Sequence, residues 1–198
     1  MRWFRSFRRL YCTIFALITI CSVNLISQTK YQFHIEQRLL YMSEQILMDQ
    51  VGKREKHANQ GIVTVYLRSV GLKSGNPYCA AGQYYCYAEA CNRLGLKETY
   101  IPFKKTGLSR EIYNDAAKKG KRVDYSPAKH DFIIWRLKGN SWRGHIERII
   151  KVCDKGWVLT VGFNVAMDDG GEGVAIKKRN IYHPVGRLII YGLVGFGG

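Results

Sequence analysis

Residues 75–90 read GNPYCAAGQYYCYAEA, and this stretch predicts the start of a helix beside a cysteine. Asn76 is a residue type that caps helix N-termini, and Pro77 suits the first helical position because its missing N–H needs no acceptor there. Cys79 then falls at the third helical position, and Gly95 can end the helix. We therefore expect a helix whose first turn carries a thiol.

A thiol in that position has a chemical use if an imidazole lies beside it. A thiol attacks a carbonyl only as the thiolate, and both a helix N-terminus and a neighbouring imidazole stabilise that anion. His34 lies in a predicted linker helix, and the other histidines are the candidates: His57, His130, His145 and His183. We prefer His145, because it follows Gly144 at the start of a predicted strand, where it can be held rigidly and still reach a substrate. His130 begins the preceding strand and is the second choice.

A third polar group usually fixes the orientation of such a base. Asn164, at the end of the next predicted strand, is placed to do so if the two strands form a hairpin. Glu147 is a rival, because it lies two residues from His145 on the same face of the strand. Three further carboxylates follow in a polar turn whose spacing matches no recognised calcium-binding loop: Asp168, Asp169 and Glu172.

The hydrophobic periodicity changes along the chain. Helical spacing predicts helices over residues 31–51 and 109–119, whereas residues 61–70 fit either a helix or a strand. After Pro127, apolar runs separated by Gly, Asn and Asp predict strands: 131–137, 145–152, 157–163, 173–178 and 187–194. Helices followed by an antiparallel sheet predict an α+β fold.

The first 27 residues have the pattern of a targeting segment. Arginines in the first nine residues precede an uncharged apolar run at 10–26, which is long for a signal-peptide core and slightly short for a membrane span. We expect a signal-anchor, or a signal peptide that is removed, and either one exports the domain. The chain then divides into a targeting segment at 1–27, a linker helix at 28–44 and a domain at 45–198.

The net charge of +16 favours an acidic partner such as nucleic acid, anionic lipid or another acidic polymer. The basic residues are scattered and form no arginine-rich helix, which together with the expected export argues against nucleic acid. An exported domain could carry disulfides, but no cysteine or histidine spacing suggests zinc. We expect Cys86, Cys91 and Cys153 to be buried thiols.

An ordered set of motifs runs along residues 45–195: Val-Gly-x-Arg-Glu from Val51, an Asn-containing loop, Asn-Pro-aromatic-Cys-Ala-Ala at 76–81, Pro-x-x-x-Asp from Pro127, Gly-His-apolar at 144–146, and Gly-Glu-Gly-Val at 171–174. With this set, residues 45–195 resemble a CHAP-type (papain-like, NlpC-related) cysteine amidohydrolase/peptidase domain that acts on bacterial peptidoglycan. The pattern differs at three places: Gly82-Gln83 replaces larger apolar residues, Glu147-Arg148 replaces small or apolar residues, and Gly162-Phe163 replaces Glu-Gly before Asn164.

The resemblance implies a papain-like α+β fold, with N-terminal helices, including residues 61–70, packed on a C-terminal antiparallel sheet. It implies Cys79 as the nucleophile, His145 as the general base and acid, and Asn164 as the orienting residue, with no cofactor and no metal. The expected activity is hydrolysis of a peptidoglycan amide bond by a monomer on the periplasmic or extracellular face, anchored by residues 10–26 or secreted. A non-catalytic domain of the same fold that binds the cell wall is the alternative.

Overall fold

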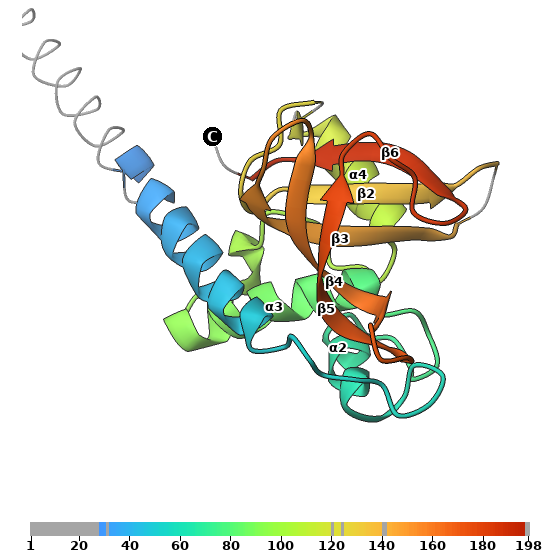
Figure 1. Cartoon of the computed structure of the whole chain (residues 1–198). Coiled ribbons are helices and arrows are strands. Elements are labelled where there is room, and N and C mark those ends of the chain that lie inside the picture. Colours follow the sequence, from blue (N-terminus) through green and yellow to red (C-terminus); the bar gives the residue numbers. More distant parts are fainter. Residues whose placement is uncertain (1–27, 31, 120, 124, 140–141, 197–198) are drawn as a thin grey trace, which may run out of the picture. The chain divides into compact units, whose positions relative to one another are not determined.

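The computed structural model describes residues 28–196, apart from residues 31, 120, 124 and 140–141 (Figure 1). The chain divides into two units, Met1–Arg38 and Leu39–Gly198. In the first unit, residues 28–30 and 32–38 are helical, and the expected targeting segment at 1–27 lies outside the described residues. Within the described ranges, no helix has both the length and the apolar character that crossing a bilayer requires.

The compact unit begins at Leu39, earlier than the domain start expected at residue 45. Leu39 and Leu40 are buried in the main apolar core. The guanidinium of Arg148 donates hydrogen bonds to the Leu40 carbonyl at 3.1 Å and to the Ser43 hydroxyl at 2.9 Å. The last residues of the expected linker helix therefore belong to the fold itself.

The helices of the compact unit lie close to their expected positions. Residues 39–48 are helical, and residues 61–70, which fitted either state, are helical as the resemblance implies. The remaining elements before the sheet are, in chain order: η1 (Gly61–Val63), α2 (Thr64–Ser69), α3 (Cys79–Leu94), η2 (Glu98–Tyr100) and α4 (Ser109–Lys118).

One helix boundary differs from the expectation. The helix α3 begins at Cys79 itself, so the cysteine is the first helical residue and not the third. The reason is that Asn76 donates its side-chain amide to the Lys73 carbonyl at 3.0 Å, within the preceding turn, and does not cap the helix. Gly95 ends α3 in the left-handed conformation, with φ +66°, as expected.

The second half of the compact unit is an antiparallel sheet with the strand order β1-β6-β2-β3-β4-β5. Its strands are: β1 (Arg122–Val123), β2 (Phe132–Leu137), β3 (Gly144–Val152), β4 (Trp157–Ala166), β5 (Glu172–Asn180) and β6 (Leu188–Val194). Every strand predicted from the sequence is present, and only the short β1 was not predicted. The expected α+β class is confirmed, with α3 packed against β3 and β4 (Figure 1).

The two faces of the sheet carry different apolar clusters. Residues of one face, such as Ile146 and Phe163, join the main core with α3. Residues of the other face, such as Trp135, form a smaller cluster. Because side chains alternate along a strand, His145 and Glu147 lie together on the face opposite to Ile146. This alternation brings the imidazole and the carboxylate to one side of β3.

Candidate active site

Cys79 and His145 lie side by side, although they are far apart in the sequence. Cys79 is the first residue of α3, and His145 is the second residue of β3. The Cys79 Sγ atom lies 4.0 Å from the carbonyl oxygen of Gly144, the residue before His145. The Cys79 side chain is close enough to the imidazole to act to raise the pKa of His145. The start of α3 thus lies beside the start of β3, where the thiol and the imidazole come together.

His145 has a second partner in Glu147. Its Nε2 atom lies 3.0 Å from Oε1 of Glu147, and both side chains are buried. Burial by itself lowers the pKa of His145, but the hydrogen bonds and charges of Cys79 and Glu147 outweigh burial and raise that pKa to about 10. The site therefore stabilises a protonated imidazole between a sulfur and a carboxylate.

Glu147 is held by side chains from two neighbouring strands. Thr160 of β4 donates its hydroxyl to Oε2, and Arg179 of β5 donates to both carboxylate oxygens at 2.7 to 3.1 Å. Burial acts to raise the pKa of Glu147, but the contacts with His145 and Arg179 lower it to about 2. Glu147 is therefore ionised at neutral pH, and its orientation is fixed.

Asn164 was expected to orient His145, and the structure places its amide elsewhere. The residue lies at a β-bulge in β4 with φ +57°, a conformation that asparagine tolerates well. Its Oδ1 accepts a hydrogen bond from the Tyr78 N–H at 3.3 Å, and its Nδ2 donates to Glu172. The group that contacts the His145 ring is Glu147, the rival candidate, whereas Asn164 accepts the peptide N–H of Tyr78, just before Cys79.

Gly162 makes room for this arrangement. It is the cross-strand partner of Glu147 in the β3–β4 hairpin. A Cβ atom at Gly162 would lie 3.0 Å from both Cγ and Cδ of Glu147, which is tighter than an ordinary contact. The absence of a side chain on β4 therefore leaves the space that the carboxylate of β3 occupies.

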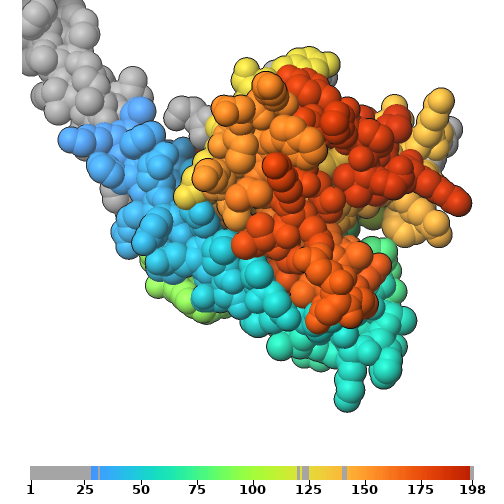
Figure 2. Space-filling model, viewed as in Figure 1, coloured from blue at the N-terminus to red at the C-terminus, as the bar shows by residue number. Residues whose placement is uncertain are grey.

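The remaining candidate carboxylates and two of the remaining candidate histidines have partners of their own. Their contacts are: Asp169 with Arg54, Asp168 with Lys177, Glu172 with Asn164, His130 with Arg148, and His183 with Trp157. Arg54 also donates to the Gly170 carbonyl at 2.8 Å, and the loop after residue 50 and the β4–β5 turn lie side by side on the surface (Figure 2). Among the residues that the structure describes, no cluster of His, Cys, Asp or Glu could hold a metal ion.

The other cysteines of the compact unit differ from Cys79 in their surroundings. All are free thiols, and Cys86 and Cys91 are buried as expected, whereas Cys153 is half-buried. Burial raises the pKa of Cys86 to about 12 and that of Cys91 to about 11. These two thiols are therefore protonated and unreactive at neutral pH.

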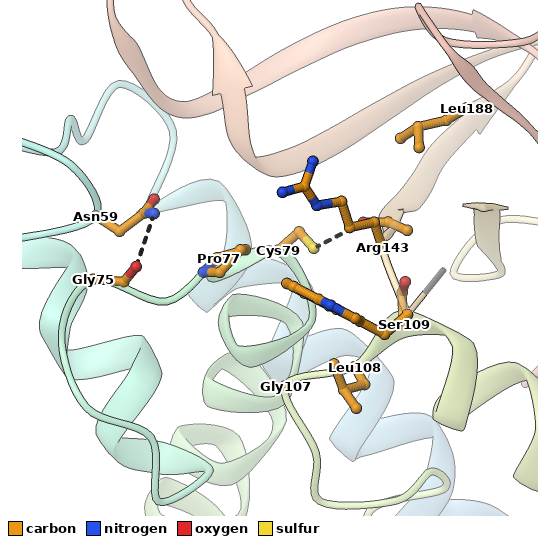
Figure 3. Close-up of a pocket in the computed structure, with 11 residues that line it drawn as sticks. Asn59, Gly75, Pro77, Cys79, Gly107, Leu108, Ser109, Arg143 and Leu188 are labelled. Carbon is orange, nitrogen blue, oxygen red and sulfur yellow. Dashed lines mark hydrogen bonds between the residues drawn. The ribbon is translucent and has the colours of Figure 1, made fainter. Parts of the chain in front are cut away.

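An open pocket of about 460 Å³ gives access to Cys79 (Figure 3). Its wall is formed by residues from the loop before α3, the start of α4, and the segment that leads into β3: Asn59, Gly75, Pro77, Cys79, Gly107, Leu108, Ser109, Trp142, Arg143, Gly144 and Leu188. Cys79 is only 5% exposed, so this pocket and not the outer surface presents the sulfur to a ligand.

Comparison with known proteins assigns no role to this site. No family model, no curated protein and no solved structure matches the chain. The geometry around Cys79 and the residues of the sequence are therefore the grounds for a functional proposal.

Proposed function

We propose that this protein is a cysteine-dependent hydrolase of amide bonds with a papain-like fold. The observation that carries the proposal is the position of His145, which lies close to Cys79 and contacts a buried, ionised Glu147. A nucleophile beside a base that is itself oriented by a third group is the arrangement that activates thiols in covalent catalysis.

In the proposed reaction, the Cys79 thiolate attacks the carbonyl carbon of the substrate amide. The backbone N–H of Cys79 can donate to the developing oxyanion, because the first N–H of a helix has no intrahelical acceptor. The His145 imidazolium then gives its proton to the leaving nitrogen as the C–N bond breaks. Neutral His145 next takes a proton from a water molecule that attacks the thioester, which releases the acid and restores the thiolate–imidazolium pair.

We propose bacterial peptidoglycan as the substrate, on the strength of the resemblance over residues 45–195. Two departures from the family pattern have a physical explanation that supports this proposal. Glu147 fills the space beside Gly162, and the ring of Phe163 fills the space beside Gly82, where a Cβ would lie 2.2 Å from the ring. The family pattern carries a side chain at each of these two glycine positions. In this protein, a side chain from another residue occupies the same space.

The proposed setting of the enzyme is outside the cytoplasm. Residues 1–27 would export the domain, and residues 10–26 would anchor it in the membrane unless they are removed. The net charge of +16 would attract the monomeric domain to an acidic wall polymer.

Thiol labelling and wall digestion test the chemistry together. We expect iodoacetamide at neutral pH to label Cys79 at least about ten times faster than Cys86 or Cys91, because thiolates and not thiols react. Site-resolved mass spectrometry measures these rates separately. Cys79→Ala should abolish the release of soluble fragments from purified peptidoglycan without changing the unfolding temperature, whereas the control Cys153→Ser should remain active.

The alternative of a non-catalytic domain predicts a different result. Wall binding without fragment release by the wild-type protein, together with slow labelling of Cys79, would identify a wall-binding domain of the same fold. Fragment release that persists in Cys79→Ala would rule out the thiol mechanism.

A further inference from the structure

Two carboxylates near Cys79 have no role in the proposed reaction. The backbone N–H of Glu55 donates to the Glu172 carbonyl at 3.1 Å, which joins the loop after the first helix to the start of β5. The Glu172 carboxylate accepts a hydrogen bond from Nδ2 of Asn164. Asn164 also accepts the N–H of Tyr78, which directly precedes Cys79. These contacts connect both glutamates to the start of α3.

The two glutamates lack the basic partner that a neighbouring carboxylate has. Asp168, in the turn before β5, pairs with Lys177 at 2.8 Å. Within the described part of the chain, no Lys or Arg side chain forms an ion pair with Glu55 or Glu172. Burial and the charge of Glu55 raise the pKa of Glu172. Two carboxylates therefore repel each other here, in a chain whose net charge is +16.

The hydroxyl of Tyr78 lies close to the same two carboxylates. Burial, followed by the charges of Glu55 and Glu172, raises the pKa of Tyr78 above its ordinary value. Tyr78 is fully buried. Neither its hydroxyl nor Oε2 of Glu55 completes a hydrogen bond of good geometry with the residues that the structure describes. Buried polar atoms without such a bond are costly, so the cluster favours a ligand that donates hydrogen bonds and carries a positive charge.

We propose that Glu55 and Glu172 bind an ammonium group of the substrate, and that the enzyme prefers amides with a free amine close to the cleaved bond. This inference rests on the proposed function, because Cys79 defines which bond is cleaved. Glu172 is exposed and Glu55 is half-buried, so the ligand can approach the pair from solvent.

An ammonium group suits this cluster better than other cations do. It is a compact charge with three N–H donors, so it can contact both carboxylates at once. A guanidinium is a planar fork that matches a single carboxylate. A metal ion needs further ligands, and no cluster of described His, Cys, Asp or Glu side chains could hold one.

The test uses matched synthetic peptides near neutral pH that differ in one group. One carries a free amine on the residue beside the scissile amide, the second carries the acetylated amine there, and the third carries the free amine several residues away. We expect wild-type kcat/KM to favour the first peptide about ten- to hundred-fold over the second, the value of hydrogen bonds to a charged group. The net charge of +16 repels cations, so it cannot produce this preference.

Substitutions of the pair test its role. Glu172→Gln keeps the size of the side chain without the charge and should remove most of the preference, and Glu55→Gln should act in the same direction. Glu172→Lys should reverse the preference, because like charges repel. Each preference is a ratio measured with one protein, so it does not depend on the overall rate of a variant. Asp168→Asn, which removes an exposed charge from the same turn, is the matched control and should keep the full preference.

The possible results separate the inference from the proposed function. Equal rates for the first two peptides, an equal preference for the distant amine, or a preference that survives in both glutamine variants would overturn the inference. A loss of preference in Asp168→Asn would assign it to the overall charge of the turn, and a loss in EDTA would assign it to a metal ion. Either result would also overturn the inference.

Hydrolysis that survives in Cys79→Ala would instead overturn the proposed function. Binding of the three peptides to Cys79→Ala, measured by calorimetry, makes the same comparison without turnover. Tighter binding of the first peptide, together with no hydrolysis by the wild-type protein, would support the ammonium site and refute the proposed function.

Discussion

At the scale of single residues, the buried carboxylate of Glu147 controls the charge of His145. Thr160 and Arg179 hold that carboxylate in place and ionised, and together with Cys79 it raises the pKa of the imidazole to about 10. A general acid must keep its proton until the leaving group needs it. The contacts that hold the Glu147 carboxylate therefore set the pH above which the proposed reaction slows.

We predict that Glu147→Gln moves the alkaline limb of the pH profile of kcat/KM to lower pH. The wild-type imidazolium persists until the pH approaches about 10, and without the carboxylate it loses its proton at lower pH. The measurement is kcat/KM between about pH 6 and about pH 11. Glu89→Gln, which breaks only a surface pair with Arg93, should leave the limb in place, and an unmoved limb in Glu147→Gln would contradict the assigned role.

The position of the carboxylate can be tested by moving it to the neighbouring strand. Glu147→Ala should lower kcat by about a hundred-fold or more, the usual contribution of general acid–base catalysis. A Cβ at position 162 would also lie 2.7 Å from Val165 Cγ1, so Val165→Ala is included in each variant. Adding Gly162→Glu then places a carboxylate on β4, directly opposite the emptied position, and should recover at least about ten-fold of the loss. A combined variant no faster than the one without Gly162→Glu would argue against the proposed equivalence of the two strand positions.

At the scale of secondary-structure elements, one ring determines how closely α3 approaches the sheet. Phe163 of β4 occupies the space beside Gly82 in α3, and it also packs edge-on against Tyr66 of α2, with ring centroids 4.9 Å apart. This close approach helps to bring the first residue of α3 to the start of β3. The distance between Cys79 and His145 therefore depends on a glycine outside the proposed catalytic group.

We predict that Gly82→Ala destabilises the protein by about 1–3 kcal/mol, the usual cost of overpacking a core. A loss of stability is informative here, because alanine is otherwise favoured over glycine inside a helix by about 1 kcal/mol. In a Phe163→Ala background, the same substitution should become neutral or stabilising. Urea unfolding of the four proteins measures both effects, and equal destabilisation in both backgrounds would show that the ring is not the cause.

At the scale of the whole compact unit, Arg148 connects its first helix to the sheet. The buried guanidinium donates to the Leu40 carbonyl, the Ser43 hydroxyl and Nδ1 of His130, and it lies 4.9 Å from the centroid of the Tyr87 ring. His130 can accept this hydrogen bond only while Nδ1 is unprotonated. Burial and the charge of Arg148 together lower the pKa of His130 to about 4.

We predict that this contact makes the stability of the unit depend on pH. The folded pKa of His130 lies below its ordinary value of 6.5, so its contribution is fully present above about pH 6.5 and is lost as the pH falls through about 4. The stability advantage of wild type over His130→Asn should shrink across that range. Asparagine suits the positive φ of +79° at this position.

Urea unfolding at several pH values measures this difference. Comparison with the variant separates His130 from Asp131, whose pKa burial raises to about 6 and whose effect on stability has the opposite sign. The nearby charges of Glu44 and Lys129 are the same in both proteins. A stability difference that stays constant from pH 4 to pH 7 would contradict the role of His130 as a neutral acceptor.

The sequence by itself determined the α+β class and the positions of the strands, and it indicated Cys79 and His145 as the preferred candidates. These features follow from local patterns: apolar periodicity, Gly and Asn between strands, and an Asn-Pro turn before a cysteine. Such patterns depend on neighbours along the chain, so they can be read without coordinates. The helix start was displaced because Asn76 found its hydrogen bond in the preceding turn.

Only the tertiary structure decided which group orients His145. Asn164 and Glu147 were both within reach in the sequence, and the choice depended on a bulge that turns Asn164 toward Tyr78 and on a glycine that opens space for Glu147. The support from Arg179 depended on a strand that the sequence places 32 residues away from Glu147. Contacts across strands are set by register and by the volume of facing side chains, and a linear pattern carries neither of these quantities.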